Sequence, residues 1–114
     1  MRGNQQVAVI QFGAGSAALT GNDFAILQRV AEIQRNSRAT VRIVAHAQQD
    51  AAGASANYEV SRQRALAVAN QLVRLGVPAS RIVAEAASDA EPAFETTSAR
   101  GIAANRRAEI FVDF

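Results

Sequence analysis

The residues whose types and spacing best fit a binding site lie in residues 57–76, which have the periodicity of an amphipathic helix. The apolar stripe of this helix comprises Ala65, Val68, Leu72 and Leu75. Toward the N-terminus the same face carries Asn57, Ser61 and Arg64, at helical spacing. A helix that only filled a core would stay apolar to its end. We therefore predict that this polar half borders a cleft or another segment of the chain.

The segments that must position this helix alternate between strand-like and helix-like patterns. The strand-like segments are residues 7–12, 40–46, 81–86 and 105–114. A first helix is predicted from an N-cap at Thr20 to residues 36–38, with Phe24, Leu27, Val30, Ala31 and Ile33 on its apolar side. The second is predicted to be capped by Ser55 and ended by Gly76 and Pro78. This order, βαβαβ(α)β, predicts an α+β fold with helices packed on a mixed parallel and antiparallel sheet.

Two connections complete this predicted topology. The first is a loop of small residues, 13–16, whose backbone is able to approach another group closely. It lacks the Gly-Lys-Ser/Thr of a phosphate-binding loop, so nucleotide binding is not expected. The second contains a turn at residues 88–92 and a predicted helical turn within residues 97–104.

Composition restricts the function classes. The 114 residues fit one domain, 1–114, and the 49% hydrophobic content is that of a globular chain. All basic residues are arginines, spread without interleaved aromatics, and the net charge is only +2, so nucleic-acid binding is not expected. There is no cysteine and a single histidine, which excludes thiolate chemistry and a multi-histidine metal site. No placed pair of catalytic carboxylates is evident, and we expect neither an enzyme nor a cofactor.

Three motifs occur in the order found in one known family. The first is Phe12 with Ser16 and Leu19. The second is Asn57-x-x-Val60-Ser61-x-x-Arg64-Ala65-x-x-Val68, and the third is Asn105-Arg106-Arg107-Ala108-Glu109-Ile110. Together they resemble the OmpA-like C-terminal domain, the peptidoglycan-binding module of Pal lipoproteins and MotB-type stator proteins. The resemblance covers nearly the whole chain and implies the same fold.

The resemblance also implies a ligand and the residues that bind it. The family binds the free end of diaminopimelate, a zwitterion that needs both a cation and an anion from the protein. Its carboxylate is bound by the arginine that corresponds to Arg64, because a guanidinium can donate two parallel hydrogen bonds. Its ammonium is bound by the aspartate of a Gly-His-Thr-Asp motif after the second strand. Asn57 is expected to hold the adjoining loop through hydrogen bonds to the backbone.

The sequence departs from the family at the ammonium site. His46 matches the family histidine, but Gln48 stands where the aspartate belongs. A glutamine carbonyl accepts a hydrogen bond from an ammonium without supplying a charge. Asp50, two residues later, is the alternative anion if the loop is shifted by one residue. In a purely structural interpretation, Arg64 pairs with Asp50 or Glu59 and fixes the loop against the helix.

Two functions therefore remain open. The first is a noncovalent anchor that attaches a periplasmic envelope protein to diaminopimelate-containing peptidoglycan, with residues 1–114 forming one domain of a longer protein. Any membrane attachment would then come through a preceding region, because no apolar run here is long enough to span a bilayer. The second is a protein-interaction or scaffolding domain that keeps the fold and has lost the glycan site.

Two further interpretations concern side chains near the predicted strand ends. As a lone strand-end histidine, His46 is expected to be packed or hydrogen-bonded rather than catalytic. Arg106 and Arg107 should point to opposite faces of the last strand, one toward the cleft and the other into solvent.

Overall fold

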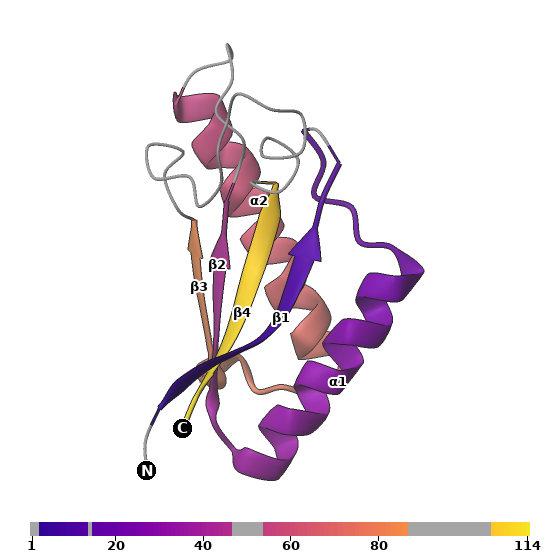
Figure 1. Ribbon diagram of the computed structural model, residues 1–114, viewed down its shortest axis with the longest axis vertical. Helices are drawn as coiled ribbons and strands as arrows, with labels where there is room; N and C mark the ends of the chain where they lie inside the picture. Colours follow the sequence, from indigo (N-terminus) through magenta and orange to yellow (C-terminus); the bar gives the residue numbers. More distant parts are fainter. Residues whose placement is uncertain (1–2, 14, 47–53, 87–105) are drawn as a thin grey trace.

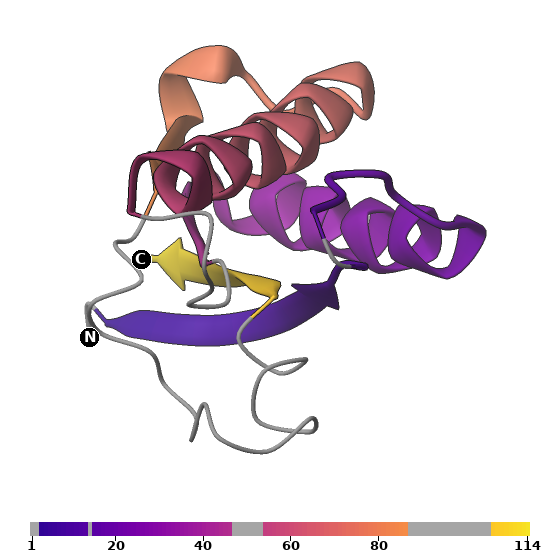
Figure 2. The same ribbon diagram turned by 90° about the horizontal axis from the view of Figure 1, so that it is seen from above.

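The computed structural model describes residues 3–13, 15–46, 54–86 and 106–114, and of residues 54–57 the backbone alone. Two helices, α1 (Gly21–Ser37) and α2 (Ala54–Arg74), pack on one face of a four-stranded sheet (Figures 1 and 2). The predicted α+β class and mixed sheet are confirmed. The predicted turn at 88–92 and helical turn within 97–104 lie outside the described residues.

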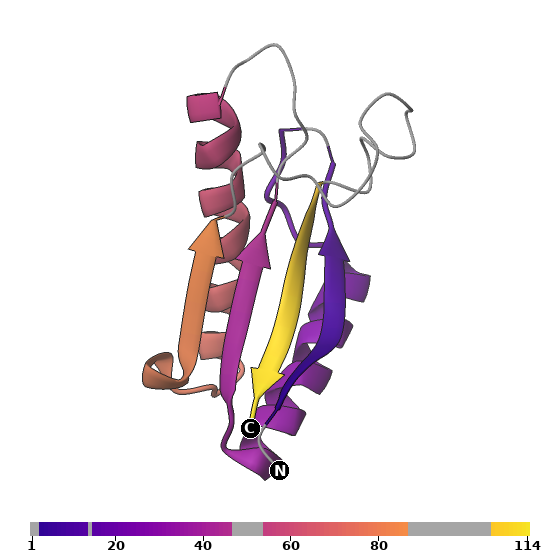
Figure 3. The ribbon, with the colours of Figure 1, turned by 60° about the vertical axis from the view of Figure 1, so that its left-hand side comes forward.

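The sheet places the last strand of the chain in its interior. Its strands are β1 (Asn4–Gln11), β2 (Thr40–Ala45), β3 (Ile82–Ala86) and β4 (Arg107–Asp113). Their order is β1-β4-β2-β3, which can be followed across Figure 3. β4 runs antiparallel to both of its neighbours, while β2 and β3 are parallel. The carboxyl ends of β1, β2 and β3 therefore meet at one end of the sheet, together with the start of β4.

Alternation along the strands separates a core face from an open face. Ala108, Ile110 and Val112 of β4 are fully buried, as are the β2 residues that lie beside them. Leu27 and Val30 of α1 and Val68 and Leu72 of α2 cover this face. Phe111, which is partly buried, lies on the other face because successive side chains of a strand point to opposite faces. Both helices are therefore held to the sheet by aliphatic packing.

Helix α1 begins at the predicted cap. Thr20 Oγ1 accepts a hydrogen bond from the Asp23 backbone N–H (3.3 Å), and the Asp23 carboxylate accepts one from the Thr20 N–H (2.8 Å). This reciprocal pair is a capping box. The helix ends at Ser37, and Arg38 takes a left-handed conformation (φ 57°). The prediction that Phe24 lies on the buried side is wrong: its side chain is 43% exposed, and Leu27, Val30 and Ala31 form the buried stripe.

Helix α2 ends as predicted and begins earlier. Gly76 takes a positive φ of 98°, which a residue without Cβ adopts readily, and the Val77 N–H bonds to the Leu72 carbonyl. At the other end the helix already includes Ser55, so the prediction of Ser55 as its N-cap is wrong. Among the described residues, no helix is long and apolar enough to cross a membrane.

The strand boundaries differ from prediction by one to three residues. β1 extends back to Asn4 because that residue pairs with Asp113 at the end of β4. A 3-10 turn, η1 (Ala79–Arg81), contains Arg81, so β3 starts one residue later than predicted. Glu85 lies on the exposed side of β3 and pairs with Arg42 at 3.0 Å.

Candidate functional site

Arg64 is the largest fully buried side chain in the described part of the molecule, with 1% of its surface exposed. Its guanidinium donates three hydrogen bonds to backbone carbonyls. Nε donates to Ser16 O (2.8 Å), Nη1 to His46 O (2.9 Å) and Nη2 to Gly13 O (3.0 Å). Arg64 thereby joins α2 to the loop after β1 and to the end of β2.

A tight loop after β1 supplies two of these three carbonyls. The loop after β1 turns tightly: the Ser16 N–H bonds to Gly13 O at 3.1 Å, and Gly15 takes a positive φ of 63°. The prediction that the polar half of the second helix meets another segment is confirmed, because Arg64 contacts this loop and Ser61, one turn earlier, is fully buried. The prediction that the small-residue loop lets its backbone approach another group is confirmed by the same bonds.

The environment of Arg64 is positive. Burial, and secondarily the charge of Arg106, lowers the pKa of Arg64 to about 10, so the guanidinium remains charged at pH 7. It lies over the Phe12 ring, 5.2 Å from the centroid. Arg106 Nε donates to the Phe12 carbonyl at 3.1 Å, which places the second guanidinium nearby.

No carboxylate among the described residues forms a salt bridge with Arg64. The alternative pairing with Glu59 is wrong, because Glu59 binds Arg62 (2.8 Å) and Gln63 (2.9 Å) on the exposed side of α2. A guanidinium carries five N–H groups, and the three carbonyl bonds use one on each nitrogen. Within the described structure, Nη1 and Nη2 therefore each keep one N–H for a further acceptor.

His46 lies beside this site in a buried ionic cluster. Its Nε2 is 2.8 Å from Glu109 Oε1, which also accepts a hydrogen bond from Arg107 at 3.4 Å. His46 Nδ1 is buried and has no hydrogen-bond partner among the residues that the structure describes. The prediction that His46 is hydrogen-bonded is confirmed. The prediction that either Arg106 or Arg107 is solvated is wrong: Arg107 is 3% exposed beside Glu109, and Arg106 is half-buried against Phe12.

The His46 cluster makes stability depend on pH. Burial, and then the charge of Arg107, lowers the pKa of His46 below its ordinary value of 6.5, outweighing the hydrogen bond that His46 donates to the Glu109 carboxylate. As pH falls below about 6.5, the unfolded chain gains this proton before the folded chain does, so stability decreases. We expect the free energy of unfolding, measured with urea, to fall from pH 7 toward pH 5.5 and to level off once the folded state is also protonated.

His46→Gln is the matched variant, because glutamine donates a hydrogen bond to Glu109 without titrating. The chain has a single histidine, so this variant should lose the pH dependence in that window. Equal pH dependence in both proteins would contradict the assignment.

The predicted site residues divide into three groups. Arg64 lies at the junction just described. Gln48 and Asp50 lie outside the described residues, and Asn57 is placed in α2 by its backbone alone. The sequence analysis missed Glu109 as a functional neighbour. The signal was present, since Glu109 shares a strand face with Arg107 and belongs to the motif Asn105-Arg106-Arg107-Ala108-Glu109-Ile110. Among the described residues, no three potential metal ligands gather into a site.

The fold and these motifs define a class of envelope-associated domain, and comparison with known proteins supports it. The OmpA family model matches residues 11–106, so the chain belongs to the OmpA family. The cell wall anchor of the type VI secretion system from Pseudomonas aeruginosa is 31% identical, with a TM-score of 0.77 over 92% of this chain and 78% of that one. The peptidoglycan-associated lipoprotein from Burkholderia pseudomallei has a TM-score of 0.83 at 22% identity, over 93% and 89% of the two chains.

One longer protein also matches this chain over part of its length. Outer membrane protein 40 of Porphyromonas gingivalis is 31% identical over 87 residues, which are 76% of this chain. The chain spans 23% of the length of that relative. The match therefore covers one part of the longer protein and does not extend to its remaining length.

Proposed function

We propose that this domain binds peptidoglycan noncovalently and anchors a periplasmic envelope protein to the cell wall through the diaminopimelate of the stem peptide. Membership of the OmpA family supports the general function. The similarity to a protein described as a cell wall anchor supports it further, at 31% identity over most of both chains. The proposal involves no catalysis and no cofactor.

The observation that carries the proposal is the state of the Arg64 guanidinium. A buried cation whose described partners are three neutral carbonyls has lost its hydration without gaining a counter-ion. A ligand carboxylate would supply that charge and accept the two remaining N–H groups in parallel. Because Arg64 is 1% exposed, the carboxylate reaches it after a local opening at this end of the sheet.

The rest of the proposed clamp comes from the resemblance. Diaminopimelate is a lysine with a second carboxylate on its ε-carbon, so its free end is a zwitterion. In the proposed complex Arg64 takes the carboxylate, Asp50 or Gln48 takes the ammonium, and Asn57 holds the intervening loop. Asp50 would supply a full opposite charge, whereas Gln48 would supply a carbonyl dipole.

The test is sedimentation with purified sacculi, comparing wild type with Arg64→Lys and Arg62→Lys. Lysine keeps the positive charge but cannot donate two parallel hydrogen bonds to a carboxylate. Arg64→Lys should therefore bind sacculi at least about tenfold more weakly, equivalent to about 1.4 kcal/mol. Arg62→Lys is the matched control, because Arg62 lies on the same helix and is exposed beside Glu59. It should sediment like wild type.

Competition identifies the bound group. Free diaminopimelate should release the wild-type protein from sacculi, whereas Nα-acetyl-lysinamide, which keeps an ammonium but has no carboxylate, should not. If folded wild type stays in the supernatant, the peptidoglycan proposal fails, and the alternative is a protein-interaction or scaffolding domain with a degenerate glycan site. If sacculi bind and Nα-acetyl-lysinamide competes equally well, the carboxylate-specific role of Arg64 fails while wall binding stands.

A further inference from the structure

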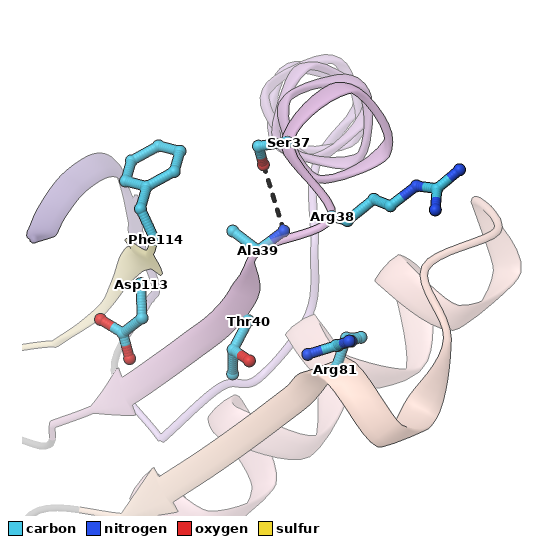
Figure 4. Close-up of a pocket in the computed structure, with 7 residues that line it drawn as sticks. All are labelled: Ser37, Arg38, Ala39, Thr40, Arg81, Asp113 and Phe114. Atoms are coloured by element: carbon cyan, nitrogen blue, oxygen red, sulfur yellow. Dashed lines mark hydrogen bonds between the residues drawn. The ribbon is translucent and has the colours of Figure 1, made fainter. Parts of the chain in front are cut away.

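A polar cavity lies at the opposite end of the sheet from Arg64. It has a volume of about 460 Å³, and its lining includes Arg38, Thr40, Arg81, Asp113 and Phe114 (Figure 4). Thr40 begins β2, and His46 follows the end of that strand, so the cavity and the Arg64 site are about 20 Å apart at ~3.3 Å per residue. The two sites are therefore separate.

Strand register arranges three of the lining residues in a row. Thr40 of β2 pairs with Asp113 of β4. On the other side of β2, Val41 pairs with Ile82 in parallel register, so the preceding residues, Thr40 and Arg81, are also adjacent. Figure 4 shows the Arg81 side chain directed toward Thr40, with Asp113 beyond it, while the Arg38 side chain extends away from Asp113. Across the strands, the row therefore presents the Arg81 cation, the Thr40 hydroxyl and the Asp113 carboxylate in that spatial order.

The two charges of this row do not neutralise each other. Their strands are separated by β2, which puts the backbones of Arg81 and Asp113 about 10 Å apart at ~4.8 Å per strand. Among the described residues, neither side chain forms a salt bridge, and Asp113 Oδ1 is buried without a hydrogen-bond partner. The charge of Asp113 contributes to raising the pKa of Arg42, but the Arg42 guanidinium is paired with Glu85.

We propose that this cavity binds a small zwitterion with an α-amino-acid head group. The ligand carboxylate accepts hydrogen bonds from the Arg81 guanidinium, and its ammonium donates to the Asp113 carboxylate. The Thr40 hydroxyl lies between them and can donate or accept. Phe114, which is 49% exposed, offers an apolar surface to the ligand side chain. A ligand with one charge would satisfy one end of the row and leave the other charge unpaired.

The test is an amide NMR titration of the protein with L-alanine, with acetate and ethylammonium as single-charge controls. Alanine should shift the amide signals of Thr40, Arg81 and Asp113 to saturation, and each single-charge compound should bind at least about tenfold more weakly. Arg81→Gln and Asp113→Asn should each weaken alanine binding by at least about tenfold, since each removes one charge-assisted bond. Arg74→Gln, an exposed change on α2, is the matched control and should bind like wild type.

Three outcomes would overturn this proposal. One is the absence of saturable shifts at the three residues with alanine. Another is equal binding of acetate and alanine, which would reduce the cavity to an anion site. The third is unchanged affinity in Arg81→Gln or Asp113→Asn while their spectra remain those of a folded protein. None of these outcomes bears on sacculus binding through Arg64, so the two proposals stand or fall separately.

Discussion

Arg64→Met is expected to lower the free energy of unfolding by about 3 kcal/mol or more. Methionine fills much of the same volume but donates no hydrogen bond, so the carbonyls of Ser16 and His46 lose this donor, while Gly13 O keeps its bond from the Ser16 N–H. Leaving a buried acceptor unsatisfied costs about 1–3 kcal/mol, and water entering the site would recover part of the sum for the two carbonyls. Urea unfolding at pH 7 measures the change.

Arg62→Met is the matched control for this variant. It removes the same charge from the same helix, but Arg62 is exposed and its ion pair with Glu59 is at the surface. Surface pairs contribute about 0–1 kcal/mol, so a small change is expected. If the two variants were equally stable, the three carbonyl bonds of Arg64 would not contribute to the fold, and its burial would need another explanation.

Ile110→Ala is expected to destabilise the protein by about 2–5 kcal/mol, the usual range for removing three buried carbons from a packed core. Ile110 is fully buried on β4, the strand that joins β1 to β2. It pairs with Ala8 on one side and Ile43 on the other. Neighbours held on both sides cannot easily collapse into the cavity. Denaturant unfolding measures the loss.

Val83→Ala provides the comparison for Ile110. Val83 lies on the edge strand β3 and is 45% exposed, so its truncation opens no enclosed cavity. A change within about 0.5 kcal/mol is expected for such a surface site. A loss below about 1 kcal/mol in Ile110→Ala would contradict the tight packing of the core between sheet and helices.

The sequence predicted the elements well because their signals are local. Ala108, Ile110 and Val112 alternate along the predicted strand 105–114, which places them on one face, and the structure buries all three. The cap at Thr20 depends on a hydrogen bond to a residue three positions later, and the cap at Gly76 depends on the ease with which glycine adopts a positive φ. Both are therefore visible in a few consecutive residues. Phe24 was misplaced because helical periodicity defines an apolar arc and not its edges, and Leu27 with its neighbours already fills the contact with the sheet.

The site was less predictable because its partners are backbone atoms. The sequence indicated that the polar half of α2, with Arg64, borders a cleft or another segment of the chain. It carries no signal for the three carbonyls, since every residue has one. Their convergence depends on how the loop after β1 and the end of β2 are brought together by the sheet. The link between His46 and Glu109 is likewise long-range, 63 residues apart, and arises from the pairing of β2 with β4.

The interior position of β4 has a consequence for how the protein is made. Within the described sheet, β4 is the strand neighbour of β1, yet it is the last of the described strands to be synthesised. A nascent chain that has not reached Arg107 therefore presents β1 without its partner and β2 with one edge unpaired. The native sheet can close only when the C-terminal strand inserts between segments that are already present. Folding of this domain is consequently dominated by contacts that are distant in sequence, and it is completed only once β4 has been made.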